Sequence, residues 1–167
     1  TALADIAAEV GLARSSLYRY FPDKHHIVLR WFERELLPVL ETSAAILSGP
    51  GSVDDRLARW LDYQLDEMAK PEHDLLARVG EEAAAANEEV RVAIADGHVA
   101  MYRTLGAVMQ EALEVHRPKG ARRRDAMVVT RLLGGVVSAA GRAILDGSDP
   151  RVVRAEAHRT LRAVLAG

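Results

Sequence analysis

Side chains that can contact DNA gather on one face of a short predicted helix near the start of the chain. The apolar residues of this helix, Leu17 and Phe21, lie four positions apart and face inward. The polar residues of its outward face are Arg14, Ser15, Tyr18 and Arg19. Guanidinium, hydroxyl and phenol groups reach base edges and phosphates in a major groove. The sequence therefore indicates a DNA contact surface, although any amphipathic helical hairpin presents a polar face.

Two short helices must position this face. In the first helix, which begins at Thr1, apolar residues recur at helical spacing. These residues are Leu3, Ile6, Ala7 and Val10. Gly11 ends that helix, and after a turn a second helix is predicted from Arg14 to about Tyr20, before Pro22. Two short helices joined by a glycine turn form the layout of a helix-turn-helix.

The order of residues in this segment carries a family resemblance. The residues are Thr1, Asp5-Ile6-Ala7, Gly11-Leu12, Leu17-Tyr18-Arg19-Tyr20-Phe21 and Lys24. Their order and separation resemble the N-terminal signature of the tetracycline-repressor-like (TetR/AcrR) family of bacterial transcription regulators. Beyond this segment the resemblance is one of size and helix layout only.

The resemblance implies a role for individual residues of the segment. Arg14, Ser16 and Tyr18 stand where such proteins read bases or grip the DNA backbone. Phosphate contacts are implied for Thr1, Tyr20 and Lys24. Lys24 also begins the next helix, whose free backbone N–H groups favour an anion.

The segment departs from the family pattern in two respects. Ala13 stands where the family usually has a serine that caps the recognition helix, so that cap is absent or moved to Ser15. The family's DNA-binding domain has three helices, and the first has no counterpart before Thr1. We therefore expect residues 1–33 to be a partial helix-turn-helix domain.

Composition narrows the class of protein. Of 167 residues, 49% are apolar and 28% are charged, as in a folded globular chain. The formal net charge of −2 argues against non-specific coating of DNA. Cysteine is absent, which fits a cytoplasmic protein. No apolar run approaches the ~20 residues of a membrane span, so we predict no membrane partner.

Helical spacing continues to the end of the chain and predicts an all-α fold. Asp23 is expected to cap a helix that Pro38 kinks or divides, and Ser52 begins a capping box. Asn87 and Asp149 are further predicted caps. We assign residues 34–167 to a helical domain for ligand binding and dimerisation.

Two C-terminal helices are the predicted dimer interface. The helix from Arg122 to Asp146 is apolar nearly all round, so it needs partners on two sides. A two-fold, four-helix contact with the final helix would bury both stripes. The predicted contact residues are Leu133, Val137, Ala140, Ile144, Leu161 and Leu165. The resemblance implies the same interface; the alternative is that both helices only complete a monomeric core.

The middle helices would hold an effector. Aromatic, methionine and polar residues recur there at helical spacing and could line an apolar cavity, although such stripes more often form ordinary core. The candidates are Trp60, Tyr63, Gln64, Met68, Arg78, Glu82, His98, Met101, Tyr102 and Leu105. Ligand binding rests mainly on the resemblance, which implies a switch between two states.

Three functional classes are compatible with the sequence. The first is a homodimeric DNA-binding regulator, a repressor by resemblance, that binds a palindromic double-stranded operator and is released by a small-molecule effector. The second is an all-helical ligand-binding or interaction module without sequence-specific DNA binding. The third is an enzyme, for which the sequence offers no phosphate loop, nucleophile or metal set. We predict the first class, without cofactor or metal.

Overall fold

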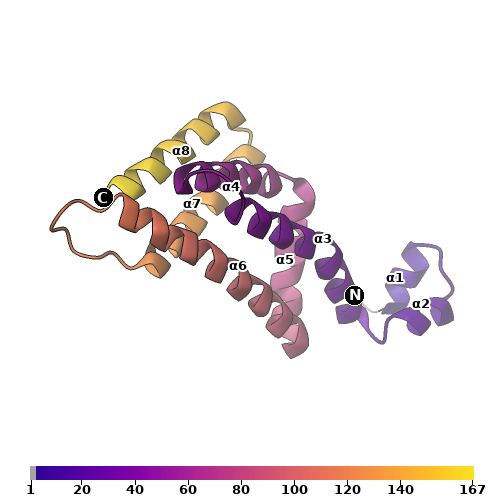
Figure 1. The fold of residues 1–167 in the computed structure, drawn as a ribbon. Helices are drawn as coiled ribbons and strands as arrows, with labels where there is room; N and C mark the ends of the chain where they lie inside the picture. The colour runs from indigo at the N-terminus through magenta and orange to yellow at the C-terminus, as the bar shows by residue number, and fades with distance from the viewer. Residues whose placement is uncertain (1–2) are drawn as a thin grey trace.

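The computed structural model describes residues 3–167, and it describes their side chains except those of residues 73–78. The described chain contains eight α-helices and no strand, which confirms the all-α prediction. The helices are α1 (Leu3–Glu9), α2 (Arg14–Tyr20), α3 (Lys24–Leu47), α4 (Val53–Met68), α5 (Pro71–Ala86), α6 (Glu88–Val115), α7 (Ala126–Leu145) and α8 (Pro150–Ala166). Figure 1 shows α1 and α2 as a small head at one end, joined to the helical body by α3.

The head is held together by one small apolar cluster. Its buried members are Leu3, Ala7 and Leu17, and Ile6, Phe21 and Ile27 pack against them. Ile27 belongs to α3, so the start of this long helix packs against the cluster. Gly11, with φ of 68°, makes the turn between α1 and α2, since this left-handed conformation suits glycine.

Val10 departs from the predicted apolar stripe. The first helix ends at Glu9, so Val10 leaves the helical spacing of the residues before it. Its side chain is 57% exposed. The turn, which begins one residue before Gly11, therefore removes Val10 from the head cluster.

Four of the predicted helix caps form hydrogen bonds in the structure. The Asp23 carboxylate accepts from the backbone N–H groups of His25 and His26. Ser52 begins a reciprocal capping box with Asp55 at the start of α4. Asn87 and Asp149 cap α6 and α8 through their side-chain oxygens. Each cap satisfies backbone donors at the start of its helix, which helps to fix where that helix begins.

Pro38 does not divide α3, which excludes one of the two effects expected of it. The helix is continuous from Lys24 to Leu47 with Pro38 inside it. Proline has no N–H to donate to the carbonyl of Arg34, so α3 lacks one of its regular hydrogen bonds there. Leu36 and Leu40, which flank Pro38 in the sequence, belong to the apolar cluster around Phe32.

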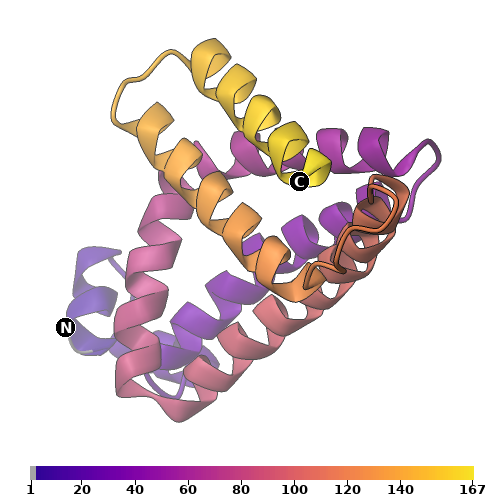
Figure 2. The same ribbon diagram turned by 90° about the vertical axis from the view of Figure 1, so that its left-hand side faces the viewer.

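The main core lies among α4, α6, α7 and α8, with the end of α3 packed against it. Trp60, Leu61, Leu105 and Met109 are among its fully buried members. Figure 2 shows α7 and α8 lying across α4, with α6 crossing the first half of α7. A second, smaller cluster around Phe32 occupies the contact of α3 with α6.

Helix α7 begins later than the sequence spacing predicted. It runs from Ala126 to Leu145 and is capped by Asp125, whereas the prediction placed its start at Arg122. By length and composition it is the one helix of the described chain that could span a membrane, although only 28% of its most apolar window is buried in this single chain. Counting uninterrupted apolar runs overlooked this helix, because Arg131 and Arg142 interrupt it.

Candidate DNA-binding face and effector cavity

The outward face of α2 carries the predicted DNA-contact residues. Arg14, Ser15, Tyr18 and Arg19 are exposed on this helix, whereas Leu17 is buried in the head cluster. At 3.6 residues per turn, these four positions share one side of the helix. The helix therefore projects donors and an aromatic ring from a surface that the fold leaves uncovered.

Both arginines of α2 lie over tyrosine rings. The guanidinium carbon of Arg14 is 5.3 Å from the centre of the Tyr18 ring, and that of Arg19 is 5.0 Å from the Tyr20 ring. Arg19 Nη2 also donates to the Tyr20 hydroxyl at 3.0 Å. Stacking orders a guanidinium while leaving most of its N–H groups free. The pairs thus present oriented donors toward a ligand.

Of the two remaining predicted DNA contacts near this face, Ser16 and Thr1, the structure describes only Ser16. Ser16 is half-buried at the flank of the face, on the same side of α2 as exposed Tyr20. Thr1, for which a phosphate contact was expected, lies outside the described residues.

The start of α3 differs from the expected anion site. The backbone N–H groups of His25 and His26 donate to the Asp23 carboxylate at 2.8 and 3.1 Å, so these donors are not free for a phosphate. A hydrogen bond from the His26 side chain is the main cause that holds the pKa of Asp23 below its ordinary value, against the opposing effect of burial. What remains for an anion here is the exposed ammonium group of Lys24.

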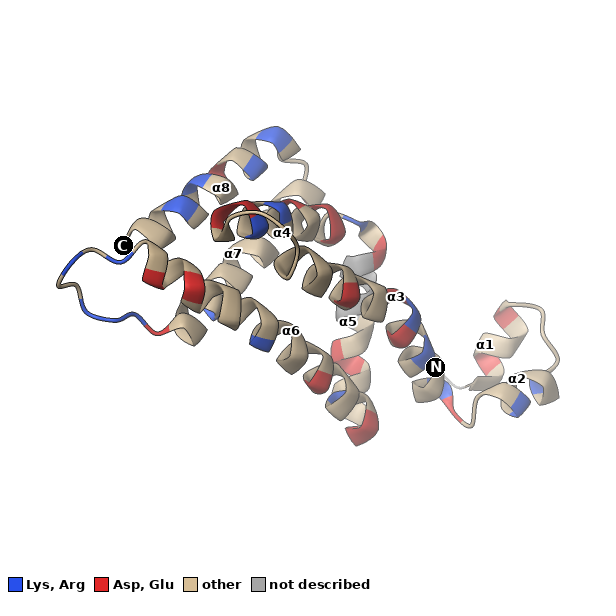
Figure 3. Cartoon of the chain, in the orientation of Figure 1, with Lys and Arg blue, Asp and Glu red and all other residues tan. Residues whose placement is uncertain are grey.

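A second group of cations lies far from the head. Figure 3 places the basic loop between α6 and α7 at the opposite end of the molecule from α1 and α2. Within that loop, Arg117 and Arg123 pair with Glu114, and Arg124 donates to the carbonyl of Val164. Three cations of the loop thus already form ion pairs or hydrogen bonds with the helical body.

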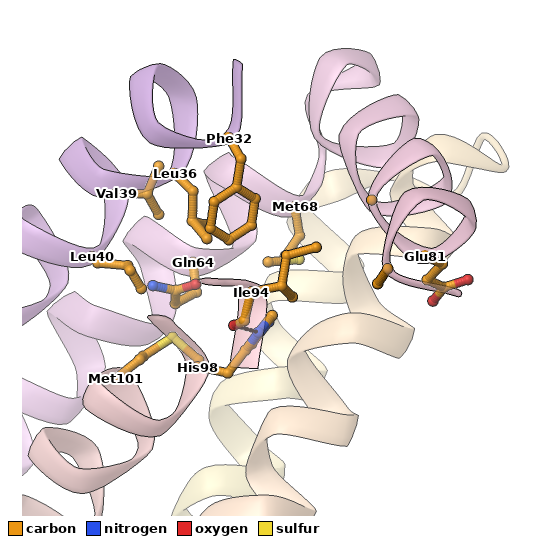
Figure 4. A pocket seen from close by; sticks show the side chains of 12 residues that line it. Phe32, Leu36, Val39, Leu40, Gln64, Met68, Glu81, Ile94, His98 and Met101 are labelled. Carbon is orange, nitrogen blue, oxygen red and sulfur yellow. Dashed lines mark hydrogen bonds between the residues drawn. The ribbon is translucent and has the colours of Figure 1, made fainter. Parts of the chain in front are cut away.

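A cavity of about 250 Å³ lies between α3, α4, α5 and α6. Four predicted effector residues line it: Gln64, Met68, His98 and Met101. Figure 4 shows these side chains directed into the cavity from α4 and α6, opposite apolar side chains of α3.

Other predicted effector residues lie elsewhere. Trp60 and Leu105 are buried in the main core. The hydroxyl of Tyr102 lies against α7, where a Cβ on Gly134 would come within 2.8 Å of it. Tyr63 is half-buried outside the cavity and Glu82 is exposed, whereas its neighbour Glu81 lines the rim. The side chain of Arg78 is outside the described ones.

The sequence reasoning missed the contribution of α3 to the cavity. The missed lining residues are Phe32, Leu36, Val39 and Leu40 of α3, Gly80, Glu81 and Ala84 of α5, and Ile94 of α6. Four of them recur at helical spacing along α3, so a signal was present, but Phe32 was interpreted only as a core anchor. Because the same apolar stripe serves a core or a cavity wall, spacing alone does not separate the two.

Four of the six predicted dimer residues are buried within the single chain. Leu133, Val137, Leu161 and Leu165 belong to the main core, and only Ala140 and Ile144 are partly exposed. The exposed apolar surface of α7 and α8 comes from neighbouring positions, which include Val128, Leu132, Ala139 and Val152. A helix that is apolar all round does not reveal which side faces its own core, and this explains the difference.

Metal-ligating side chains do not gather in the part of the chain whose side chains are described.

The fold and the exposed face of α2 define an all-helical protein with an N-terminal helix-turn-helix, a layout of DNA-binding regulators. Residues 1–30 match the family model described as "Bacterial regulatory proteins, tetR family". This match confirms the resemblance over the matched residues, which have the helix-turn-helix pattern of this family. No curated protein matches the sequence.

Solved structures share the fold over the whole chain. A protein from Pseudomonas aeruginosa PAO1, assigned as a transcriptional regulator, has a TM-score of 0.83 at 17% identity, covering 100% of this chain and 81% of that chain. An assigned regulator from Saccharomonospora viridis, in complex with choline, has a TM-score of 0.72 at 20% identity, with coverage of 96% and 84%. The fatty acid degradation regulator FadR from Bacillus halodurans has a TM-score of 0.72 at 16% identity, with coverage of 100% and 85%. These likenesses concern the fold.

Proposed function

We propose that this protein is a cytoplasmic transcriptional repressor that binds a palindromic operator as a homodimer and leaves it when a small molecule enters the cavity. The observation that carries the DNA-binding part is the exposed face of α2, where two arginines are ordered over tyrosine rings. In this proposal Arg14, Tyr18 and Arg19 reach base edges and phosphates in the major groove.

A homodimer is the second part of the proposal. Two recognition helices related by a two-fold axis enter major grooves about 34–36 Å apart or at a multiple of this distance. The exposed apolar surface of α7 and α8 supports this, since a lone protomer would leave Leu132 and Val152 in water. In the dimer, these two helices of each protomer form the interface.

Release by an effector is the third part. Helix α3 starts beside the recognition helix at Lys24 and lines the cavity with Phe32, Leu36 and Leu40. A molecule that pushes on this wall moves the start of the helix and thus the head. Such a switch requires unequal binding to the two states, typically by about 1–3 kcal/mol of coupling.

Two structural neighbours are consistent with an effector site without identifying its ligand. One was determined in complex with choline, and another is named for fatty acid degradation. The fold therefore occurs in a regulator that binds a small molecule, choline.

The DNA-binding part is tested on the α2 face. An operator is first selected from random DNA with the natural protein, and its affinity is then measured for Tyr18→Ala and Arg19→Ala. We expect each substitution to weaken operator binding by about tenfold or more, because a good base or phosphate contact contributes about 1–3 kcal/mol. Arg19→Ala should also lower the salt dependence of binding.

The control is Arg122→Ala, which removes the same charge from the exposed loop at the other end of the molecule. It should leave operator affinity unchanged. Equal loss in Arg19→Ala and Arg122→Ala, with none in Tyr18→Ala, would mean that overall charge, not the α2 face, controls binding. Ligand binding without any selected DNA sequence would instead favour a helical ligand-binding module.

A further inference from the structure

The cavity between α3 and α6 has a wall that is mostly apolar and is rich in polarizable groups. Phe32 contributes an aromatic ring, and Met68 and Met101 contribute thioether sulfurs. Methionine sulfur makes favourable contacts with aromatic rings. This wall suits a flat apolar ring more than a hydrated head group.

Gln64 places a polar atom without a protein partner at the cavity. Its side chain is only 3% exposed, and its Nε2 donates to Ser43 Oγ at 2.6 Å. Among the hydrogen bonds of the described residues, none reaches Gln64 Oε1. Figure 4 shows this amide at the cavity wall, facing Ile94. The oxygen is not among the buried side-chain atoms that lack a partner, so it is accessible from the cavity. A ligand that fills the cavity and displaces water must therefore supply it with a donor, or leave it unsatisfied at a cost in free energy.

The Gln64 amide can form a hydrogen bond with a ligand hydroxyl in either orientation of the amide group. Ser43 Oγ is both donor and acceptor, so the amide can bond to it through nitrogen or through oxygen. The remaining amide group then accepts from, or donates to, the ligand. A ligand hydroxyl satisfies both cases, whereas an ether or a ketone satisfies only one.

His98 adds a second acceptor near the rim. Its Nδ1 lies 2.8 Å from the carbonyl oxygen of Ile94. A carbonyl only accepts, so Nδ1 carries the proton and Nε2 of the neutral ring is an acceptor. Both polar groups thus favour a ligand that donates a hydrogen bond.

Charge and size narrow the ligand class further. Among the described lining residues there is no Lys or Arg, and the one carboxylate, Glu81, is exposed at the rim. A buried anion would therefore lack a described cation to pair with. The volume of about 250 Å³ exceeds the roughly 150 Å³ of an engineered cavity that binds benzene. One substituted ring fits.

We propose that the cavity binds a neutral, single-ring phenol, with its ring between Phe32 and the methionine sulfurs and its hydroxyl on the Gln64 amide. The inference rests on the proposed function only in making this molecule the effector. Calorimetry on the natural protein tests it with p-cresol, toluene, benzoate and choline as probes. We expect p-cresol to bind at least tenfold more tightly than each of the other three.

The variant Gln64→Leu tests the hydroxyl contact. It should weaken p-cresol binding about tenfold and leave toluene binding unchanged, so that the preference for the phenol disappears. The control Gln110→Leu removes an amide of α6 that bonds to Glu114 outside the cavity, and it should keep the preference. Tighter binding of choline or benzoate, or an unchanged preference in Gln64→Leu, would overturn the proposal.

A second variant guards against loss of folding. Gln64→Leu leaves the buried Ser43 hydroxyl without its partner, so Ser43→Ala/Gln64→Leu removes both polar groups together. The double variant should show the same selective loss. Operator affinity measured with and without p-cresol separates the two proposals. If p-cresol binds selectively but does not release the operator, the phenol site is supported and release by an effector is contradicted. If p-cresol does not bind, the phenol site is overturned while operator recognition stands.

Discussion

Ala13 leaves the recognition helix without a side-chain cap. Its backbone has φ of −62° and ψ of 133°, the extended conformation of a capping residue, but its methyl group accepts no hydrogen bond. Ala13→Ser supplies an oxygen to the first N–H groups of α2. We expect the free energy of unfolding to rise by about 1 kcal/mol, measured by denaturant titration, with slower hydrogen exchange in α2.

A matched change of opposite sign serves as its control. Ser52→Ala breaks the capping box of α4 and should lower the free energy of unfolding by about 1 kcal/mol. If Ala13→Ser gave no gain while Ser52→Ala gave the expected loss, the start of α2 would be stabilised in another way.

Residue roles that depend on near neighbours were predictable from the sequence. The caps at Asp23, Ser52, Asn87 and Asp149 act within a few positions, and the structure contains all of them. The orientation of Gln64 toward a cavity depends instead on residues far away in the chain. The sequence named Gln64 as a candidate, but it gave no sign of the Ser43 partner.

At the level of helices, Pro38 marks a missing hydrogen bond in the helix that joins head and cavity. Pro38→Ala restores an N–H for the Arg34 carbonyl and should raise the free energy of unfolding by about 1–3 kcal/mol. The regular helix should also reduce the effect of an effector on operator affinity. Denaturant titration and operator binding with effector measure the two effects.

The neighbouring substitution Leu37→Ala is the control, because this exposed side chain lies on the same helix without affecting its backbone bonds. It should change neither quantity strongly. A Pro38→Ala protein with unchanged stability would mean that the missing bond is compensated by the surrounding packing.

An ionic cluster joins α4 to α8 and makes stability depend on pH. Asp62 accepts hydrogen bonds from Arg154 at 2.7 Å and from His158 at 2.8 Å. Burial raises the pKa of Asp62, but the bonds from His158 and Arg154 outweigh it and lower this pKa below 3.8. The unfolded chain therefore binds more protons in acid, and this stabilisation is present above the unfolded pKa and lost as pH falls through the folded one.

We expect Asp62→Asn to lower the free energy of unfolding at pH 7 by less than about 1 kcal/mol, since the group is partly exposed. The difference from the natural protein should shrink as pH falls below about 4. Urea titrations at pH 7, 4 and 3 measure it. Glu33→Gln, which breaks an exposed pair with Arg30, is the control, and an equal effect there would remove any special role of Asp62.

The sequence predicted where helices begin and end more accurately than it predicted what each helix packs against. Spacing predicted both ends of α2, and caps predicted the starts of α4 and α8, because these signals are local. The predicted start of α7 at Arg122 was wrong, because the cap at Asp125 was not recognised in the sequence. The wall formed by α3 was missed because a cavity exists only where helices meet imperfectly.

For the whole molecule, the exposed apolar surface of α7 and α8 predicts the oligomeric state. Leu132 is 65% exposed at the centre of α7. We expect Leu132→Glu to convert a dimer into protomers, because a charge in an apolar contact is costly without a partner. Operator affinity should fall by tenfold or more with the loss of the second head. Light scattering and operator binding measure these effects.

Val115→Glu is the matched control, because this residue is equally exposed, at 65%, on another helix. It should keep the oligomeric state and the operator affinity. A natural protein that is already a single protomer at micromolar concentration would contradict the proposed interface.

The outward side of α7, where we propose the interface, was the feature least predictable from the sequence. The apolar residues of α7 fall on every side, so the pattern indicated two contact surfaces without assigning them. Leu133 and Val137 face the chain's own core, whereas Leu132 faces outward one position away. The inward side of α7 is set by its packing against α4, α6 and α8. At Gly141, for example, a Cβ would collide with Met68 of α4.

Helix α3 also limits how the head of this protein could be exchanged for the head of another protein. It supplies Ile27 to the head, Phe32 to the cavity and Leu47 to the core within one uninterrupted helix. Inserting a single residue between Ile27 and Phe32 would turn the head by about 100° and shift it by about 1.5 Å. A grafted DNA-reading head must therefore keep the rotational phase of this helix, and a junction in the loop after Leu47 preserves that phase.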